Sequence, residues 1–409
     1  AWEGSIMNAE AHAETIVVGA GIVGLAHALV AAEQGHTVTV IERDERAVGA
    51  SVRNFGSIWP IGQFHAGDPV DFERGRRGAD VWRRVARDTG MWINDTGSLH
   101  LAYEADELAV LEELVSRTPE LAEAGARIVT ADEVAQLSPA VRAEGLIGGL
   151  HSPTELNVDP TIAIPLVAQW LQERHGVRFV WGTLVRDISM PQVHTSSGTF
   201  TCERIVVCSG SDFQTLYPDV FPPERIRRCK LQMLRTVAQP SGYGLGPTLC
   251  TSLTFLHYDS FKHLDSLSAL RQRLDAEFPL QREHGIHVLV TQTASGQITI
   301  GDSHSYDMTP DPFENQRVFD AILEYFDRFV SIPRRQVAEV WHGVYPSLRD
   351  GRPHLVAEPE PGVHIANGLG GAGMTLSFGL AHDHLAGLLH PDPAVGSSHG
   401  DVCAAPSRA

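Results

Sequence analysis

The sequence has few cysteines and no paired cysteine motif. Five cysteines occur among 409 residues, none of them spaced as C-x-x-C: Cys202, Cys208, Cys229, Cys250 and Cys403. Zinc sites need closely spaced ligand pairs, and disulfide frameworks use even numbers of cysteines in an oxidising compartment. We therefore expect no metal site, no disulfide framework and a cytoplasmic location. Cys208 and Cys229 are interpreted as packing residues.

Positive charge is also scarce. Lys and Arg total 32 against 50 Asp and Glu, which gives a formal net charge of −18. Such a surface repels phosphate backbones and anionic lipids. We expect neither a nucleic acid nor a membrane as a partner, and an anionic small molecule only where a local pocket favours it.

Long apolar runs are limited to one segment. No residue from Thr15 to Ala32 is formally charged, and this length approaches that of a membrane span. Gly19, Gly21 and Gly24 interrupt the run, so a strand, a tight turn and a helix explain it better. The N-terminal AWEGSIMNAEAHAE has no basic segment followed by an apolar one, so we also expect no secretory signal.

The same segment has the order of a dinucleotide-binding unit. Thr15–Val18 is typical of a buried parallel strand, a helix follows the glycines as far as Gly35, and His36–Ile41 is a second strand that ends at Glu42. The glycines match G-x-G-x-x-G. A glycine-rich turn alone is a weak signal, but here the strand, helix and acidic residue that the motif requires are all present.

Each residue of this unit has a physical role. Gly19 permits the tight turn, Gly21 lets the backbone approach a diphosphate, and Gly24 lets the helix pack on the strand. The diphosphate would lie at the helix N-terminus, where free N–H groups favour anions. The Glu42 carboxylate would accept hydrogen bonds from ribose hydroxyls.

Later segments predict two kinds of sheet. Parallel-type strands are expected at Val177–Trp181, Arg204–Cys208 and Val363–Ala366, and residues 226–335 are interpreted as an antiparallel sheet carrying helices. Asn94–Ala102 is also predicted as a strand. A second glycine-rich turn, Gly368–Gly379, leads into a C-terminal helix on which residues 382–384 (His-Asp-His) would form a solvated face.

Motifs in order along the chain carry a family resemblance. They are GAGIVG with Glu42-Arg43, GASVRNFG, NVDP, GTLV, VVCSG, WHGVYPSLRDGRP and GLGGAGMT. Together they resemble the D-amino acid oxidase-like flavoprotein family, which includes glycine oxidase, sarcosine oxidase and related amine oxidases and dehydrogenases. The resemblance runs from about Thr15 to Leu389.

The resemblance implies FAD as a non-covalent cofactor and an α/β fold. A doubly wound, Rossmann-like FAD-binding domain would comprise residues 1–95, 150–225 and 336–392. An interleaved α+β substrate domain on an antiparallel sheet would comprise 96–149 and 226–335, and 393–409 would form a tail. The residues expected to bind FAD are Gly19, Ala20, Gly21, Ile22, Val23, Gly24, Glu42, Arg43, Ser51, Arg53, Asn54, Val185, Ser209, Gly210, Gly343, Gly371, Ala372, Gly373, Met374 and Thr375.

The family also implies a reaction. A hydride leaves the carbon beside an amine, the imine product hydrolyses, and oxygen or another acceptor reoxidises the flavin; we expect an oxidase rather than a dehydrogenase. Because the flavin does the difficult chemistry, no catalytic acid or base is assigned.

Three positions depart from the family pattern. Many amino acid oxidases of this family have an arginine that forks onto the substrate carboxylate, and Tyr345 stands there. Gly343 replaces the cysteine that attaches flavin in sarcosine oxidase-like members, which excludes attachment through this site. Thr299 aligns with a lysine that activates oxygen in the same members, which leaves the electron acceptor open.

The segments NFGSIWPIGQ and GDSH resemble a phosphonate-degradation-associated branch of the family. This resemblance implies a small-molecule amine such as 2-aminoethylphosphonate or an N-alkylated aminophosphonate. His257 lies in a segment that would face the flavin. The residues expected to bind substrate are Tyr345, His304, Tyr258, Lys262 and Arg349, although Arg349 also suits an ion pair with Asp350.

Three alternatives stay open. The first is a glycine, sarcosine or D-amino acid oxidoreductase, against which Tyr345 counts. The second is a flavoprotein subunit or dinucleotide-binding regulator without turnover of its own. The third is an NAD-dependent dehydrogenase, which would not need the second glycine-rich turn at Gly368–Gly373.

Overall fold

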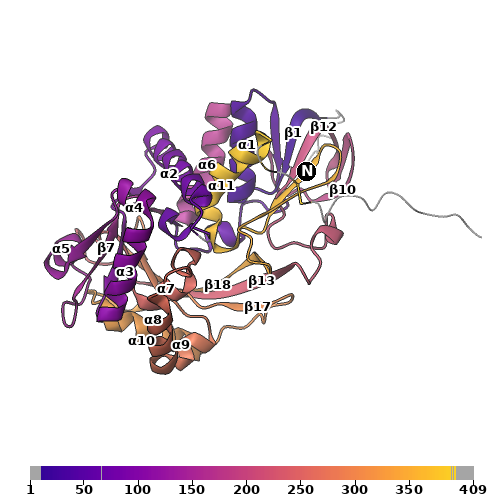
Figure 1. Cartoon of the computed structure of the whole chain (residues 1–409). Coiled ribbons are helices and arrows are strands. Elements are labelled where there is room, and N and C mark those ends of the chain that lie inside the picture. The colour runs from indigo at the N-terminus through magenta and orange to yellow at the C-terminus, as the bar shows by residue number, and fades with distance from the viewer. Residues whose placement is uncertain (1–10, 66, 388, 390, 393–409) are drawn as a thin grey trace, which may run out of the picture.

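The computed structural model describes residues 11–65, 67–387, 389, 391 and 392. The segment before residue 11, the tail predicted at 393–409 and Cys403 lie outside the described residues. The described part folds into two lobes, each built on its own large sheet (Figure 1).

The first sheet grows from the predicted βαβ unit. β1 (Ala11–Val18) lies between β2 (Val38–Ile41) and β12 (Gly198–Val207), and pairs in parallel with both. Two more strands extend the parallel part: β9 (Arg178–Val180) pairs with β2, and β20 (Val363–Asn367) with β12. The carboxyl ends of these strands therefore meet at one edge, where open α/β sheets bind their ligands.

Antiparallel strands complete the first sheet. β10 (Val185–Ser189) and β11 (Gln192–Thr195) form a hairpin against the start of β12, and β19 (Leu355–Glu360) pairs with β20. A separate small sheet consists of β3 (Ser57–Ile58), β8 (Leu156–Val158) and β4 (Ile93–Asn94), in that order.

Four helices accompany the first sheet in the upper lobe of Figure 1. They are α1 (Ile22–Glu33), α2 (Val70–Thr89), α6 (Pro160–His175) and α11 (Gly373–Leu385). α2 and α11 approach closely because glycine stands at their contact. A Cβ atom on Gly78 would lie 2.4 Å from the Thr375 carbonyl oxygen, and one on Gly379 would lie 2.5 Å from that of Arg74.

This packing overturns the prediction of a solvated face at residues 382–384. Asp383 is buried, and its carboxylate lies 2.7 Å from Arg74 Nε and 3.0 Å from an Arg77 guanidinium nitrogen, both on α2. His384 is buried as well and lies 3.0 Å from His27 of α1. The prediction was wrong because α11 packs against both α1 and α2, so that only His382 stays exposed.

The second sheet is largely antiparallel and has the strand order β17-β13-β16-β15-β14-β5-β7-β6, with β18 beside β13. Its strands come from two stretches of the chain. The bounds are β5 Ser98–Ala102, β6 Arg127–Thr130, β7 Gly148–Ser152, β13 Ile226–Thr236, β14 Thr248–Cys250, β15 Leu289–Gln292, β16 Ile298–Gly301, β17 Ser305–Asp307 and β18 Val337–Leu348.

Helices of the lower lobe pack around this second sheet (Figure 1). Their bounds are α3 Ala105–Arg117, α4 Pro119–Glu123, α5 Ala131–Leu137, α7 Ser252–His257, α8 Leu267–Glu277, α9 Pro279–Glu283 and α10 Gln316–Phe329. Buried Leu, Val, Ile and Phe side chains from both the helices and the sheet form a continuous apolar core.

Two details differ from the sequence analysis. The strand predicted at Asn94–Ala102 is divided into β4 and β5, because Gly97 turns the chain with φ 82°. β18 pairs with β13 along its length, so residues 337–348 belong by hydrogen bonding to the second sheet, although we grouped them with the FAD-binding domain. The domain boundaries as a whole stay a prediction.

The four described cysteines form no disulfide and are buried, in keeping with packing roles. Among the described residues, no helix combines the length and the apolar character that a membrane crossing requires.

Candidate active site

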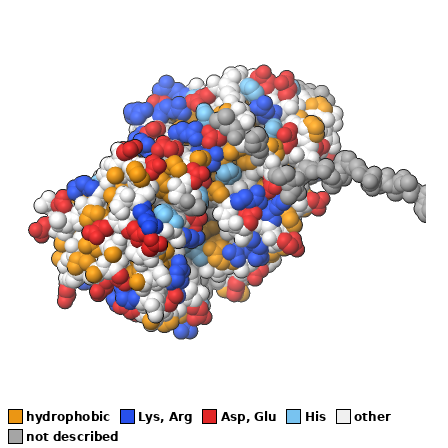
Figure 2. Space-filling view, viewed as in Figure 1, with side chains coloured by type: hydrophobic (Ala, Val, Ile, Leu, Met, Phe, Trp, Pro, Cys, Tyr) orange, Lys and Arg blue, Asp and Glu red, His pale blue; other side chains and the backbone are white. Residues whose placement is uncertain are grey.

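A cavity of about 510 Å³ lies where the two lobes meet. Its lining comes from the carboxyl edge of the first sheet, from the 42–65 segment, and from strands of the second sheet. The face of the molecule shown in Figure 2 mixes acidic and basic side chains.

The first glycine turn lies at one wall of the cavity, and contact requires glycine at two of its positions. A Cβ atom on Gly19, whose φ is 99°, would lie 2.5 Å from the Cys208 carbonyl oxygen. One on Gly24 would lie 1.9 Å from the Gly19 carbonyl oxygen, whereas one on Gly21 would lie 3.1 Å from Ser51 Oγ. These surroundings agree with the turn and packing roles predicted for Gly19 and Gly24, and the role of Gly21 toward a diphosphate stays a prediction.

Glu42 organises this turn. One carboxylate oxygen accepts from the Ala20 N–H at 2.8 Å, and the other from the Asp44 N–H at 3.0 Å. Ala20 itself does not line the cavity, whereas Glu42 and Arg43 do. Arg43 pairs with Asp212 at 2.9 Å across the cavity mouth.

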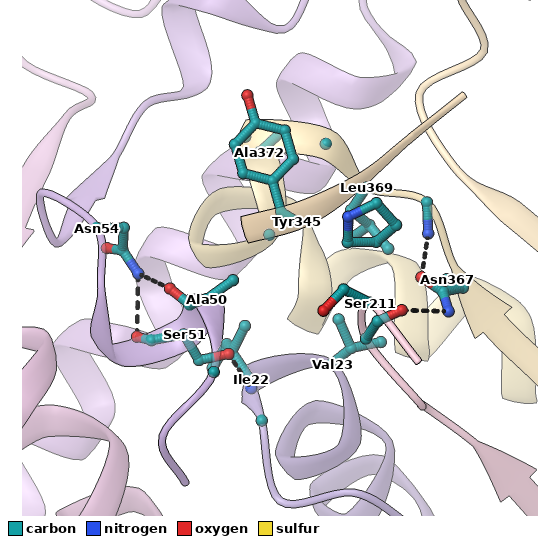
Figure 3. A pocket seen from close by; sticks show the side chains of 18 of the residues that line it. Ile22, Val23, Ala50, Ser51, Asn54, Ser211, Tyr345, Asn367, Leu369 and Ala372 are labelled. Carbon is teal, nitrogen blue, oxygen red and sulfur yellow. Dashed lines mark hydrogen bonds between the residues drawn. The ribbon is translucent and has the colours of Figure 1, made fainter. Parts of the chain in front are cut away.

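The segment that follows crosses over the start of α1. Ser51 lies in a short 3-10 helix, η1 (Ala50–Val52), and its Oγ accepts from the Ile22 N–H at 2.9 Å. The Asn54 amide donates to the carbonyls of Ala50 and Ser51. Figure 3 shows these residues on one side of the cavity, with Asn367 on the opposite side.

The second glycine turn closes the same space. It forms η5 (Gly370–Ala372) and then α11, whose N-terminus has no side-chain cap. At the N-terminus of α1 the N-cap residue Gly21 has no side chain to cap the helix, and of the first N–H groups that of Ile22 is taken by Ser51. Both helix starts line the cavity, so two helix N-termini and their dipoles face one ligand space.

Predicted FAD residues from distant segments meet in this lining. Arg53, Val185, Ser209, Gly210, Gly343 and residues 371–375 all line the cavity. Asn367, which the sequence analysis missed, donates to the Gly210 carbonyl at 3.0 Å and so ties β20 to the end of β12. These glycine cradles, acidic residue and uncapped helices fit an extended dinucleotide that carries a diphosphate.

The other end of the cavity is built mainly by the second sheet, and we call it the substrate end. It comprises the lining residues of segments 59–65 and 257–306 together with Tyr345. Its members are Trp59, Gly62, Gln63, His65, His257, Tyr258, Asp259, His287, Leu289, Asp302, His304, Tyr306 and Tyr345. Among these described lining residues there is no Arg or Lys.

Tyr345 of β18 marks the boundary between the two ends. Figure 3 shows its ring opposite Ile22, with the hydroxyl pointing away from α1. The hydroxyl oxygen lies 3.6 Å from the position of a Cβ atom on Gly371. Burial raises the pKa of Tyr345 and of Tyr258 well above the ordinary value, so both phenols are neutral at pH 7 and can donate hydrogen bonds.

Three histidines gather at the substrate end. His257 ends α7, His287 precedes β15, and His304 follows β16. The ring centroids of His257 and His287 lie 3.9 Å apart, and those of His257 and His304 4.5 Å apart. Burial lowers the pKa of His257 and His287 well below the ordinary value, so both rings are neutral at pH 7.

Asp302 lies beside this cluster. Its Oδ1 lies 3.2 Å from His287 Nε2 and 3.7 Å from His304 Nδ1. Burial raises the pKa of Asp302 to about 6, and the nearby His304 opposes this only in part. A second pair, His65 Nδ1 and Asp259 Oδ2 at 2.9 Å, lies in the same lining.

Two predicted substrate residues lie elsewhere. Lys262 has a side chain that is 55% exposed, pairs with Asp259 and is absent from the lining. Arg349 is exposed and donates to the Pro223 carbonyl instead of pairing with Asp350. Thr299 is buried in β16 outside the lining, where its hydroxyl lies 3.4 Å from Arg235 Nε.

The sequence analysis did not assign His287, Asp302, His65 or Asp259 to the site. His287 and Asp302 meet because the β15–β16 pairing places them opposite each other, joined by backbone hydrogen bonds of 3.2 and 2.8 Å. The motif GDSH contained Asp302, but only His304 was selected from it. No local sequence signal marks His287.

The fold and the site together define an enzyme that depends on a dinucleotide cofactor. Residues 14–387 match the family described as FAD dependent oxidoreductase (DAO). The chain belongs to this family, which confirms the predicted FAD-dependent oxidoreductase class. FAD is the cofactor that the two glycine turns and Glu42 fit.

A relative with a similar sequence agrees with this assignment. A D-amino acid dehydrogenase of Chromohalobacter salexigens is 28% identical over 268 residues, which are 51% of this chain and 63% of that protein. The match thus spans less than two thirds of this relative.

Solved structures confirm the predicted α/β fold. Glycine oxidase from Geobacillus kaustophilus superposes with a TM-score of 0.69 at 19% identity, covering 92% of this chain and 94% of that one. L-alpha-glycerophosphate oxidase from Mycoplasma pneumoniae, solved with FAD bound, gives a TM-score of 0.70 at 16% identity and covers 92% and 95%. At these identities the likeness concerns the fold.

Proposed function

We propose that this chain catalyses the FAD-dependent oxidation of an amine that carries a phosphonate group, such as 2-aminoethylphosphonate or an N-alkylated form of it. The imine product would hydrolyse to an aldehyde. The observation that carries this proposal is the chemistry of the substrate end. Its described lining offers histidines and tyrosines from several directions and no arginine.

The directions of the donors support the choice. The two parallel N–H groups of one arginine suit carboxylates and phosphonates alike. A tetrahedral phosphonate has three oxygens pointing in different directions, and separate donors from different segments can each reach one of them. Tyr345, Tyr258 and the three histidines come from different segments and converge on one space.

The remaining chemistry is divided between cofactor and protein. FAD, when bound, accepts the hydride from the carbon beside the amine nitrogen. The protein holds that carbon in place, and the buried Tyr345 and Trp59 keep water away from it. The two helix N-termini and Glu42 hold the cofactor, and Gly343 supports non-covalent binding because it offers no side chain for attachment.

A second candidate is an amino acid oxidoreductase. The likeness to a D-amino acid dehydrogenase favours it, and the absence of an arginine from the described substrate-end lining counts against it.

Anaerobic bleaching of the flavin's visible band separates the two candidates. The compounds are 2-aminoethylphosphonate, its N-methyl form, glycine, sarcosine and D-alanine, each added to the purified flavoprotein. We expect rapid bleaching by the phosphonates and none by the carboxylates. Bleaching by the carboxylates alone would overturn the proposal. Admitting air afterwards tests the expected oxidase, since oxygen then restores the band.

A further inference from the structure

The three histidines of the substrate end have the arrangement of a metal-ligand set. Each ring of His257, His287 and His304 offers a nitrogen, and these nitrogens all lie within 4.8 Å of one another. The rings come from α7, from the start of β15 and from the end of β16, so three separate elements fix them. Three imidazoles with an open side are typical of metal sites that keep a position for a ligand.

The surroundings hold one of the rings in the tautomer that a metal requires. His304 Nδ1 donates to the Gly285 carbonyl at 3.0 Å, which leaves the lone pair on Nε2. His287 Nε2 lies 3.2 Å from Asp302 Oδ1 but makes no hydrogen bond with it, so that carboxylate oxygen is buried without a partner among the described residues. Metal-bound histidines almost always donate their second nitrogen to a carbonyl or a carboxylate, as His304 does.

The free nitrogen of His287 strengthens this reading. His287 is 3% exposed, and its Nδ1 has no hydrogen-bond partner among the described residues. A buried polar atom without a partner is unfavourable, and a bound ligand would remove that cost. His257 makes no hydrogen bond with its ring among the described residues either, although it lies in the same lining. Both rings therefore have lone pairs with nothing bound to them.

We propose that His257, His287 and His304 bind one divalent transition-metal ion of the Zn²⁺, Co²⁺ or Ni²⁺ type, with Asp302 positioning His287. Imidazole ligands suit these ions. The open side of the ion faces the cavity, where it takes an oxygen of the substrate's anionic group. This last point rests on the proposed function.

The proposal corrects the expectation of no metal site. That expectation came from the cysteines and from short ligand spacings. These histidines lie far apart along the chain, and only the folding of α7 and the β15–β16 hairpin brings them together.

Zinc binding to the holoenzyme tests the site directly. The flavoprotein is dialysed against EDTA, then titrated with Zn²⁺ by calorimetry, and its metal content is measured by mass spectrometry. We expect one ion per chain, abolished in His287→Gln and His304→Gln. The Asp302→Asn variant should bind Zn²⁺ about 10- to 100-fold more weakly. His194→Gln, on the distant β11, is the matched control and should bind as the parent does.

Folding of the variants is checked by their flavin content and thermal unfolding. The proposal is overturned if the parent binds no Zn²⁺, or if the cluster variants keep their flavin and bind Zn²⁺ as tightly as the control.

Flavin bleaching with and without Zn²⁺ distinguishes the proposed metal site from the proposed function. Zn²⁺ should lower the concentration of 2-aminoethylphosphonate that half-bleaches the flavin. If bleaching is the same with and without metal, the metal's role toward substrate is wrong, while the proposed function stands. If Zn²⁺ binds to the cluster but no phosphonate bleaches the flavin, the metal site stands and the proposed substrate class is wrong.

Discussion

Tyr345 lies at the junction of the cofactor and substrate ends of the cavity, and its hydroxyl is the only polar group of its side chain. The buried ring is fixed by β18, and the hydroxyl lies near the η5 turn. Tyr345→Phe keeps the ring and removes one hydrogen-bonding group. We expect flavin reduction by the substrate to need about 2- to 12-fold more substrate, the effect of losing about 0.5–1.5 kcal/mol.

Stopped-flow flavin bleaching measures this effect. Unchanged kinetics would mean that Tyr345 only packs.

The negatively charged Glu42 side chain holds the first glycine turn in the shape that the cofactor needs. Its carboxylate accepts two backbone N–H groups, and the Glu42→Ala variant leaves both without an acceptor. Hydrogen bonds to charged groups contribute about 1.5–3 kcal/mol, so FAD should bind about 10- to 100-fold more weakly.

Quenching of FAD fluorescence on titration gives the dissociation constant. The exposed neighbour Glu45, which does not line the cavity, supplies the control Glu45→Gln. Purification of the Glu42→Ala protein with full flavin occupancy would contradict the assignment.

Single residues could be selected from the sequence where a local motif dictates their neighbours. The GAGIVG turn and Glu42 were selected because their surroundings depend on one βαβ unit, and the structure places Gly19, Gly21, Gly24 and Glu42 in the cavity lining. His287 and Asp302 could not be, because their contact depends on the register of a hairpin. Lys262 and Arg349 were selected for their charge, yet both turn to solvent and to nearby partners.

At the scale of elements, the contact of α2 with α11 holds the second glycine turn against the rest of the upper lobe. A Cβ atom on Gly379 would overlap the Arg74 backbone, which cannot move without displacing α2. Gly379→Ala should therefore lower the free energy of unfolding by about 1–3 kcal/mol, as overpacking in a close contact does.

Thermal unfolding of the holoenzyme measures this loss. Gly244→Ala is the control, because a Cβ atom there meets nothing within 4 Å. Equal unfolding temperatures for the two variants would show that the helices do not need this close approach.

The contact between α2 and α11 also contains a cluster of ion pairs, and its contribution to the free energy of unfolding depends on pH. Burial alone would raise the pKa of Asp383, but hydrogen bonds from Arg77 and Arg74 outweigh it and lower the pKa to about 2 from 3.8. The stabilisation is thus fully present above about pH 4 and is lost as the pH falls towards 2.

Asp383→Asn should cost about 1–3 kcal/mol at pH 7, because the buried Arg74 keeps Asp71 but loses its second carboxylate partner, and the half-exposed Arg77 loses its ion pair. The difference between parent and variant should shrink at pH 3. Urea unfolding at both pH values checks this, and a difference that does not change with pH would contradict the ionised state of Asp383.

Elements whose pattern is local were predicted well. α1, β2, β9 and β20 lie close to the ranges expected from the sequence pattern, while β1 and β12 begin earlier than expected. The sheet to which β18 belongs was not predicted, because strand pairing over a hundred residues leaves no local pattern. The burial of Asp383 was missed for a similar reason: the partner helix that covers it is distant in sequence.

At the scale of the whole molecule, the cavity joins residues from both ends of the chain. Its lining runs from Val18 to Thr375, so FAD bound along it would contact both glycine turns at once. A ligand that binds only the folded chain stabilises it by about 2.7 kcal/mol at 100 times its dissociation constant.

We therefore expect removal of FAD to lower the unfolding temperature, with full recovery as FAD is added back. Riboflavin, which lacks the diphosphate, should restore less. Scanning fluorimetry over a range of FAD concentrations tests this, and an unfolding temperature independent of FAD would contradict a cofactor held by both turns.

The position of the second glycine turn near the end of the described chain has a consequence for how the protein matures. β20 and α11 are the last described elements to leave the ribosome, and until they emerge the cofactor space has only one of its two helix starts. We therefore expect a chain cut before Val363, which lacks β20 and the second glycine turn, to bind FAD more weakly than the full sequence does.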